Sequence, residues 1–336
     1  MLKSRERSPL NYTVNWFKYR LPGSKEIVAG ISPFLLDCLR EEGFVIYPFN
    51  SKDSGILMIP YSFGLFLDDE LYPVHSNIPE STPKADYLKE VEEIADYYKD
   101  KTGKTVASRC IKIETEINLN STFAVLCRRY PEAFVFMFST EETGTWIGAS
   151  PELLLEEDSD GIHTMALAGT RPADETGEWD DKNIEEQQMV ADYIVNHLEK
   201  YCDKVENEPT FTKTAGSVAH ICTPIHASNL NVPLTEFLLK FSPTPALCGS
   251  DKEESLRLIS ELEKHEREFY GGFCGPYNIN GKTSLYAMVR SAKCSDESIC
   301  VYVGGGITKD SKPEDEWEET EMKSKTIIKS IKTKKE

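Results

Sequence analysis

The chain has 336 residues, which suits one large domain or two small ones and is enough to bury a substantial core. Its formal net charge of -18 argues against a nucleic-acid-binding protein, which needs clustered Lys and Arg. No apolar stretch is long enough to span a membrane, and residues 1–7 lack the apolar segment of a signal peptide. Nine dispersed cysteines without a C-x-x-C pair are typical of reduced thiols in a cytoplasmic protein. No association seam stands out, so we expect a monomer.

Apolar runs separated by turn residues predict strands in the N-terminal part, including Phe44–Tyr47 and Gly55–Pro60. A Pro-rich loop over Tyr72–Pro83 precedes an amphipathic helix over Lys84–Thr102, with Gly103 placed to end it. The pattern then predicts strands at Thr105–Ile113, Ala133–Phe138, Thr145–Ala149, Leu153–Glu156, Ile162–Ala168, Ser284–Val289 and Ile299–Val303, and helices at Ser121–Tyr130, Ile184–Tyr201, Leu234–Phe241, Ser255–Tyr270 and Lys312–Lys329.

Strand clusters separated by single helices predict a mixed α/β (α+β) architecture. No G-x-G-x-x-G follows a strand, so a dinucleotide site is unsupported. The segment Gly275–Thr283 superficially resembles a phosphate-binding loop, but it has five residues between its glycines where four are needed. Asn280-Gly281 between apolar runs instead predicts a β-hairpin turn.

The last predicted helix, Lys312–Lys329, carries a charged face in line with apolar residues. Ser311 and Glu314 fit a capping box, and Pro313 suits the first turn. Glu316, Glu319 and Lys323 share one face at spacings of three and four, which is usual for a solvated acidic surface. The same face continues into Ile327 and Ile331, however, which favours an orientation toward the core.

A second helix shows the same pattern, because Glu186 lies in line with an apolar stripe of Val190, Ile194, His197 and Tyr201. A first-turn glutamate commonly just favours the helix dipole. Two helices that each bring carboxylates to an apolar face are more suggestive of a metal site. Oxygen ligands without a His or Cys partner favour Mg²⁺.

Other polar residues lie at strand ends. Spacing alone makes Glu152 an edge-strand surface residue and Lys104 a solvated residue at a strand entrance. If desolvated, Glu152 would have a raised pKa and could act as a general acid, whereas a buried Lys104 could act as a base. Arg290 could contact a carboxylate in a bidentate manner. His220 fits a satisfied core histidine better than a catalyst.

Six segments taken together are specific, because they occur in register and in one order. The chain resembles the chorismate-binding enzymes, in the isochorismate synthase branch, over roughly residues 86–330. The segments are Gly148–Leu154, Ala166–Pro172, Ser242–Gly249, Arg267–Gly275, Arg290–Ser291 and Gly304–Lys323.

The resemblance implies a chorismate-binding fold, a single large domain with two β-sheets and flanking helices around a central cleft. It makes residues 86–330 the catalytic region, 1–85 a short, diverged N-terminal portion of the same domain, and 331–336 a basic tail. It implies Mg²⁺ on Glu186 and Glu319 with Glu316 beside them, a catalytic base at Lys104 and an acid at Glu152. It implies substrate contacts at Gly169, Arg290, Gly304, Gly305, Gly306 and Lys323. Thr170 and His220 are expected to contact the substrate beside these residues.

The implied activity is that of an isomerase that converts chorismate to isochorismate. Lys104 stands where the aminating relatives carry Gln, and Ala168 stands where one branch has a nucleophilic Lys. Both differences point to water as the nucleophile. Water would add at C2 with Lys104 neutral, while protonated Glu152 would donate to the departing C4 hydroxyl. Burial would favour both neutral forms.

Two alternatives stay open. A salicylate synthase would continue from isochorismate by eliminating pyruvate, and a non-catalytic chorismate-binding protein would use its acidic helices only for packing. The shortened N-terminal portion and the non-typical Asn183, Gln187 and Ser242 depart from the family pattern. We expect the product to serve menaquinone biosynthesis, with siderophore biosynthesis as the alternative.

Overall fold

The computed structural model of the chain describes residues 14–50, 55–61, 71–216 and 218–334. Residues 1–7, which were examined for a signal peptide, and the last two residues of the basic tail lie outside these ranges. Among the described residues, no helix is both long and apolar enough to cross a bilayer.

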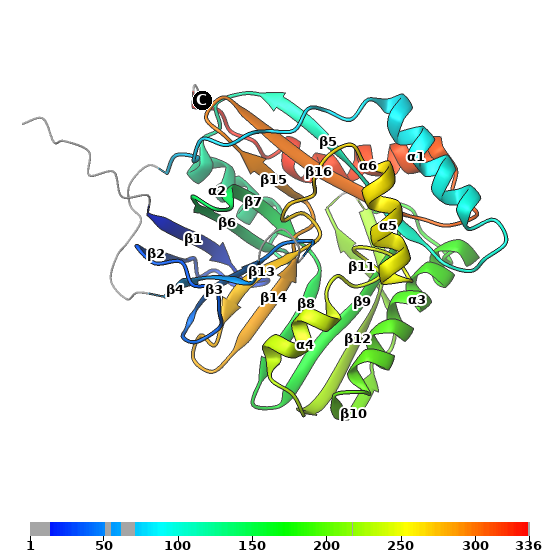
Figure 1. The fold of residues 1–336 in the computed structure, drawn as a ribbon, viewed down its shortest axis with the longest axis horizontal. Coiled ribbons are helices and arrows are strands. Elements are labelled where there is room, and N and C mark those ends of the chain that lie inside the picture. The colour runs from blue at the N-terminus through cyan, green and yellow to red at the C-terminus, as the bar shows by residue number, and fades with distance from the viewer. Residues whose placement is uncertain (1–13, 51–54, 62–70, 217, 335–336) are drawn as a thin grey trace, which may run out of the picture.

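Two antiparallel sheets form the centre of the molecule (Figure 1). The first sheet has seven strands in the order β2-β1-β6-β7-β15-β16-β5. Its strands are β1 (Asn15–Arg20), β2 (Val28–Ser32), β5 (Thr105–Glu114), β6 (Phe134–Thr140), β7 (Gly144–Ser150), β15 (Ser291–Cys294) and β16 (Ser298–Ile307). The longest pairing joins β5 to β16, with Thr105 opposite Ile307 and Gly306 opposite Val106.

The second sheet has nine strands, of which eight follow the order β10-β12-β9-β8-β14-β13-β3-β4 and β11 pairs with β12. Its strands are β3 (Gly43–Tyr47), β4 (Leu57–Pro60), β8 (Leu153–Asp158), β9 (Gly161–Pro172), β10 (Cys202–Asn207), β11 (Phe211–Ala215), β12 (Val218–Leu230), β13 (Phe273–Tyr277) and β14 (Thr283–Ala287). The N-terminal strands β1 to β4 thus contribute to both sheets.

The sheets pack face to face, and helices cover their outer faces. In β6, Phe134, Phe136 and Phe138 point into the layer between the sheets, whereas Val135 and Met137 point outward to the helices. This two-residue alternation, with both sets buried, explains the continuous apolar run in the sequence. The architecture confirms the predicted mixed fold with two sheets and flanking helices.

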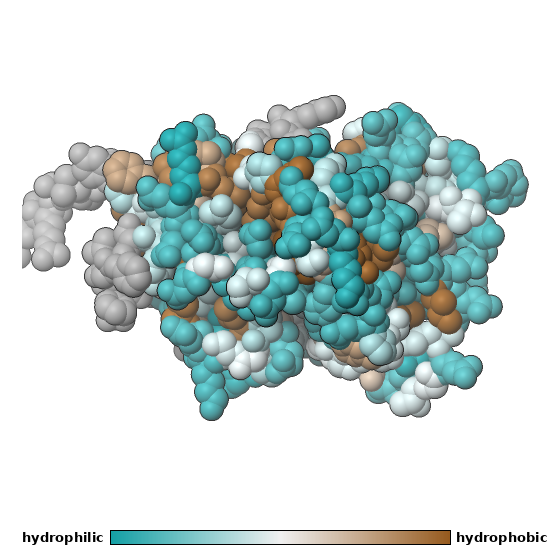
Figure 2. Space-filling view, turned by 90° about the horizontal axis from the view of Figure 1, so that it is seen from below, coloured by the Kyte–Doolittle hydropathy of each residue, from teal (hydrophilic) through white to brown (hydrophobic). Residues whose placement is uncertain are grey.

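Six helices complete the described part of the chain: α1 (Lys84–Tyr97), α2 (Leu119–Arg129), α3 (Asp181–Leu198), α4 (Leu234–Phe241), α5 (Lys252–Leu262) and α6 (Pro313–Ile328). Helices α2 and α6 cover the first sheet, and α3 and α4 cover the second. Helix α1 lies beside α6 (Figure 1). The face in Figure 2 is mostly hydrophilic with small hydrophobic areas, as the net charge of -18 suggests.

The hairpin prediction is confirmed. Strands β13 and β14 pair antiparallel, and Asn280 and Gly281 between them have φ angles of 55° and 77°. These left-handed conformations are the ones that an Asn-Gly turn accommodates.

Several predicted boundaries are wrong. Helix α1 ends at Tyr97 rather than Thr102, and α5 ends at Leu262 rather than Tyr270. Beyond α5, the Arg267 guanidinium donates to the carbonyls of Leu247 and Val106 and pairs with Glu263, which holds this segment against the sheet instead of in a helix. The capping box is absent, because Lys312 is the N-cap of α6. The Ser311 hydroxyl accepts from the Thr308 amide instead.

Candidate active site

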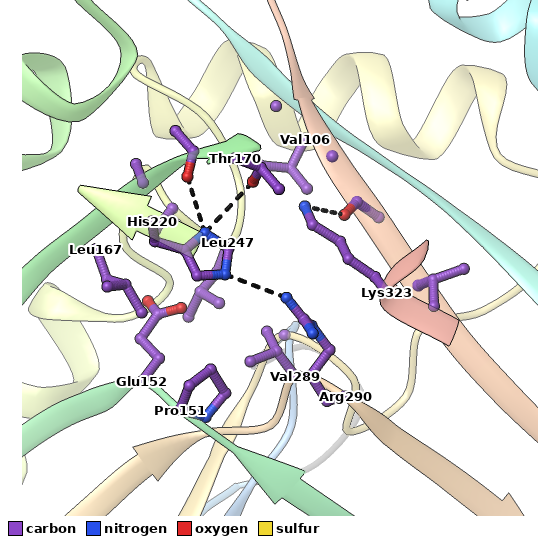
Figure 3. Close-up of a pocket in the computed structure, with 18 of the residues that line it drawn as sticks. Val106, Pro151, Glu152, Leu167, Thr170, His220, Leu247, Val289, Arg290 and Lys323 are labelled. Carbon is purple, nitrogen blue, oxygen red and sulfur yellow. Dashed lines mark hydrogen bonds between the residues drawn. The ribbon is translucent and has the colours of Figure 1, made fainter. Parts of the chain in front are cut away.

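A pocket lies where β5 and β16 of the first sheet approach β9 and β12 of the second. Its unfilled space, open solvent included, is about 710 Å³. Figure 3 shows Glu152, Arg290 and Lys323 directed toward this space from three different segments. All predicted site residues line it except Glu316 and Glu319. Those two carboxylates lie beside the backbone of Gly305, which does line the pocket.

Lys104 is placed by the entrance to β5, and its side chain is only 1% exposed. The Lys104 amide donates to the Ser250 hydroxyl and its carbonyl accepts from the Ser250 amide, so the backbone is held at both ends. The Nζ atom lies 2.9 Å from Glu186 Oε1. Lys104 is therefore buried, as a base would require. It forms an ion pair, however, where a neutral amine was expected.

Each of the three predicted metal-binding glutamates has its own lysine. Lys104 pairs with Glu186 at 2.9 Å, Lys182 with Glu316 at 2.7 Å, and Lys323 with Glu319 at 2.6 Å. These pairs bring together α3, α6 and the start of β5, far apart in sequence. The acidic cluster is thereby balanced in charge by ammonium groups, which offsets the cost of desolvating three carboxylates.

The electrostatic effects of these pairs differ between the carboxylates. Burial would raise the pKa of Glu186, but the ammonium groups of Lys104, Lys323 and Lys182 outweigh it and hold this pKa below its usual value. Burial and the neighbouring Glu319 raise the pKa of Glu316, against the opposing effect of Lys182. Of these two carboxylates, Glu186 is thus the better prepared to stay ionised.

The glycines of β16 make room for the carboxylates. A Cβ atom on Gly305 would lie 3.2 Å from Glu316 Oε2 and 3.3 Å from Glu319 Oε1. A Cβ atom on Gly306 would overlap Glu186 Oε1 and lie 3.4 Å from Lys104 Nζ. Absence of side chains here lets carboxylates from two helices approach one stretch of backbone.

This donor set fits a magnesium ion by its chemistry, because it consists of carboxylate oxygens with space beside it for substrate oxygens. Within the described ranges, no three His, Cys, Asp or Glu side chains stand close enough together to hold an ion in their present rotamers. The lysine pairs explain this, since each glutamate is turned toward an ammonium group. An ion would have to draw the carboxylates away from those partners.

The variant Gly306→Ala is expected to remain folded and to lose most of its metal affinity. The new methyl group would push the Glu186 carboxylate away from the backbone of Gly305 and Gly306, which together we call the glycine cradle. Gly305→Ala should have a smaller effect, since its methyl group would meet Glu316 and Glu319 at tight but tolerable distances. Titration of both variants with Mn²⁺ checks this order. Equal affinities for Mn²⁺ in the two variants and the wild type would contradict the proposed role of the glycine cradle.

Glu152 lies between β7 and β8 with a side chain largely removed from solvent. Burial raises its pKa to about 7, against the lowering effects of Lys104, Lys323, Lys213 and Arg290. The residue is therefore not the surface glutamate that its spacing suggested. A carboxyl group with this pKa can donate a proton near neutral pH.

The shifted pKa predicts a pH-dependent stability difference between the wild type and Glu152→Gln. The folded-state pKa of about 7 lies above the ordinary value of 4.5. As pH rises, the unfolded chain loses the proton first, so wild-type stability decreases between these values. The neutral amide escapes this loss, and its relative stability should rise by up to roughly 3 kcal/mol between pH 4 and pH 8. Denaturant unfolding at both pH values measures the difference; a constant difference would contradict the raised pKa.

His220, on β12, connects two walls of the pocket. Its Nδ1 lies 2.8 Å from the Gly169 carbonyl, and its Nε2 lies 3.2 Å from an Arg290 guanidinium nitrogen (Figure 3). Because the carbonyl can only accept and the guanidinium can only donate, this network assigns the proton to Nδ1. Burial, with Arg290 nearby, lowers the pKa of His220 well below its usual value. His220 is a satisfied neutral histidine that also lines the pocket.

Gly169 and Thr170 form the wall opposite Lys323. Gly169 has a φ of 69°, which favours glycine, and Asn183 Oδ1 accepts from the Thr170 amide at 2.8 Å. On the other side, Lys323 Nζ donates to the Gly304 carbonyl at 3.0 Å. Asn183, noted above as an atypical residue, therefore holds the part of β9 that shapes this wall.

Sequence reasoning assigned no role to three residues near the pocket. Lys182 pairs with Glu316, Tyr270 lines the cavity, and Lys213 donates to the carbonyl of Pro151, next to Glu152. Only Lys182 had a usable signal, because it precedes Glu186 by four residues on one helical face. Tyr270 was predicted to be helical, and β11, which carries Lys213, was not predicted.

Comparisons with known proteins show which family the chain resembles. The family model described as chorismate binding enzyme matches residues 69–332. The vibriobactin-specific isochorismate synthase of Vibrio cholerae is 27% identical over 312 residues, covering 85% of this chain and 78% of the relative. The isochorismate synthase DhbC of Bacillus subtilis is 27% identical over 332 residues, covering 92% and 81%. The structure of MenF, the menaquinone-specific isochorismate synthase of Escherichia coli, matches with a TM-score of 0.82 at 19% identity, covering 96% and 90%, which shows a common fold. Because the family model spans most of the sequence, the chain belongs to the family of chorismate-binding enzymes.

Proposed function

We propose that this chain is a Mg²⁺-dependent isochorismate synthase that adds water to C2 of chorismate and removes the C4 hydroxyl. The observation that carries the proposal is the arrangement of Lys104 and Glu152, a buried amine and a buried carboxyl group facing one pocket. The names of the relatives described above support the same activity. An oxygen-only donor set of Glu186, Glu319 and Glu316 would hold the metal.

The substrate would be bound by the cationic and backbone groups of the pocket. Chorismate carries two carboxylates, and the buried Arg290 and the partly buried Lys323 are cations that can face them. When bound, magnesium would neutralise carboxylate charge and orient the substrate. Gly169 and Thr170 of β9 would then close the opposite side of the ring. In the proposed complex, the reacting carbons would lie between Lys104 and Glu152.

In the proposed reaction, the Lys104 amine accepts a proton from water as its oxygen bonds to C2. The ring double bonds shift, the C4–O bond breaks, and Glu152 protonates the departing hydroxyl, which leaves as water. The amine can serve as a base only if it is neutral, and this requires that its ion pair with Glu186 is broken. We therefore propose that the Glu186 carboxylate turns from Lys104 to the metal in the active complex.

The identity of two pocket residues favours water over ammonia as nucleophile. Lys104 occupies the position where the family resemblance gives Gln to aminating members. Ala168 lines the pocket where one branch has a nucleophilic lysine. A methyl group cannot form a covalent adduct, so that route is closed to this chain.

Incubation of the purified chain with chorismate and Mg²⁺, followed by chromatographic separation, tests the proposal. We expect isochorismate as the only product. Salicylate with an equal amount of pyruvate would instead indicate a salicylate synthase. Binding of chorismate without turnover would indicate a non-catalytic protein.

A further inference from the structure

Lys182 has no role in the proposed reaction, and its position at the start of α3 is electrostatically unfavourable for a cation. It follows the N-cap Asp180 by two residues, in the first turn of the helix. The helix dipole disfavours cations at this end. The Lys182 ammonium group therefore gains its stabilisation from elsewhere, and Glu316 Oε1 lies 2.7 Å away.

The Lys182–Glu316 pair is asymmetric in its exposure to solvent. The Glu316 side chain is 2% exposed, whereas that of Lys182 is 31% exposed. Lys182 also acts electrostatically on Glu186, and both Glu319 and Glu186 act on Lys182. One ammonium group, partly exposed to solvent, thus pairs with Glu316 and interacts electrostatically with Glu319 and Glu186.

Lys182 also borders a separate surface groove outside the cluster. This groove is lined by the carboxylates Glu185, Asp192 and Asp310, by the cations Lys101 and Lys309, and otherwise by neutral residues. An ammonium group that leaves Glu316 can therefore move toward new acidic partners without entering the protein interior. Lys104 lacks this freedom, because its side chain is 1% exposed.

From this geometry we propose that Lys182 is a displaceable counter-ion that competes with the divalent cation for the three-glutamate cluster and keeps metal binding weak. This inference rests on the proposed metal-dependent function. With the metal absent, the ammonium group offsets the charge of Glu316. With the metal present, the side chain turns into the outer groove, and the cost of breaking the ion pair reduces the net affinity for the metal.

The test is direct titration of the full chain with Mn²⁺ in place of Mg²⁺, following free Mn²⁺ by electron paramagnetic resonance. Lys182→Met should bind Mn²⁺ about tenfold more tightly or better, because the competitor is gone; a factor of ten corresponds to about 1.4 kcal/mol. Lys182→Arg, which keeps the charge, should bind as the wild type does. The metal-free Lys182→Met chain should also melt at a lower temperature, and Mn²⁺ should restore its stability.

A matched control separates this effect from a general change in charge. Lys84 pairs with Glu314 in the first turn of the same helix α6, but both side chains are largely exposed, at 48% and 63%. Lys84→Met removes the same charge and should leave the affinity for Mn²⁺ unchanged. An unchanged or weaker affinity in Lys182→Met, or an equal increase in Lys84→Met, would overturn the inference. If the wild-type chain forms isochorismate and either of these results is found in the variants, only this inference is refuted. If the wild-type chain binds no Mn²⁺, the proposed function is refuted.

Discussion

Replacing Lys104 with Gln is expected to lower the rate of isochorismate formation by about 10²–10⁴-fold, which is the usual contribution of a general base. Glutamine keeps most of the volume of the side chain but cannot accept a proton from water. The effect should fall on kcat, because Lys104 acts on the attacking water in the proposed reaction. Steady-state kinetics with chorismate and Mg²⁺ measures it.

The control for this variant must consider Glu186, which loses its ionic partner when Lys104 is replaced. An unpaired buried carboxylate is destabilising, so a fall in activity could reflect partial unfolding. Lys104→Arg keeps a charge near Glu186 but cannot lose its proton near neutral pH. It should retain cooperative unfolding and remain as inactive as Lys104→Gln. Near-normal turnover in either variant would exclude Lys104 as the base.

Replacing Glu152 with Gln is the second change with a large expected effect. The amide keeps the shape of the side chain and its hydrogen-bonding ability, but it cannot protonate the departing hydroxyl. We expect kcat to fall by about 10²–10⁴-fold with little change in chorismate affinity. Steady-state kinetics measures kcat, and calorimetric titration measures the affinity for chorismate.

Glu157 provides a matched control for Glu152, because burial also raises its pKa and it lies on β8, outside the lining of the pocket. Glu157→Gln should leave kcat and chorismate affinity unchanged. A comparable loss of activity in both variants would indicate a general effect on β8. A Glu152→Gln variant with normal kcat would remove the proposed acid.

The mixed α/β class could be predicted from periodic patterns, whereas the arrangement in two sheets was implied only by the family resemblance. Strands such as β6 are buried on both faces and read as continuous apolar runs. Of the three strands missed between α3 and α4, β12 is mostly buried, whereas β10 and β11 lack this signal. Most residues of β10 and β11 are at least partly exposed, so no alternation distinguishes them from a loop.

The residue types of the site could be predicted from family motifs, but their pairing could not. The ion pair between Lys104 and Glu186 joins positions 82 apart in sequence, and that between Lys182 and Glu316 joins positions 134 apart. Such contacts depend on how α3 and α6 pack against the ends of β5 and β16. Local spacing described Glu316, Glu319 and Lys323 as one helical face, whereas the tertiary structure divides that face between two ammonium partners.

The protonation state expected of Lys104 shows the same limit. Burial alone favours a neutral amine, and the sequence argument considered only burial. The fold adds the Glu186 carboxylate at 2.9 Å, which forms an ion pair with Lys104. In the proposed mechanism, this opposition is resolved only when Glu186 turns away from Lys104.

The most direct test of the account is turnover of chorismate with Mg²⁺ in water enriched in ¹⁸O, with the product analysed by mass spectrometry. Addition of water at C2 and loss of the C4 hydroxyl predict isochorismate that carries one solvent oxygen, located on C2. Isochorismate without the label would show that the hydroxyl group moves within the molecule, and it would contradict the roles of Lys104 and Glu152 proposed for this pocket.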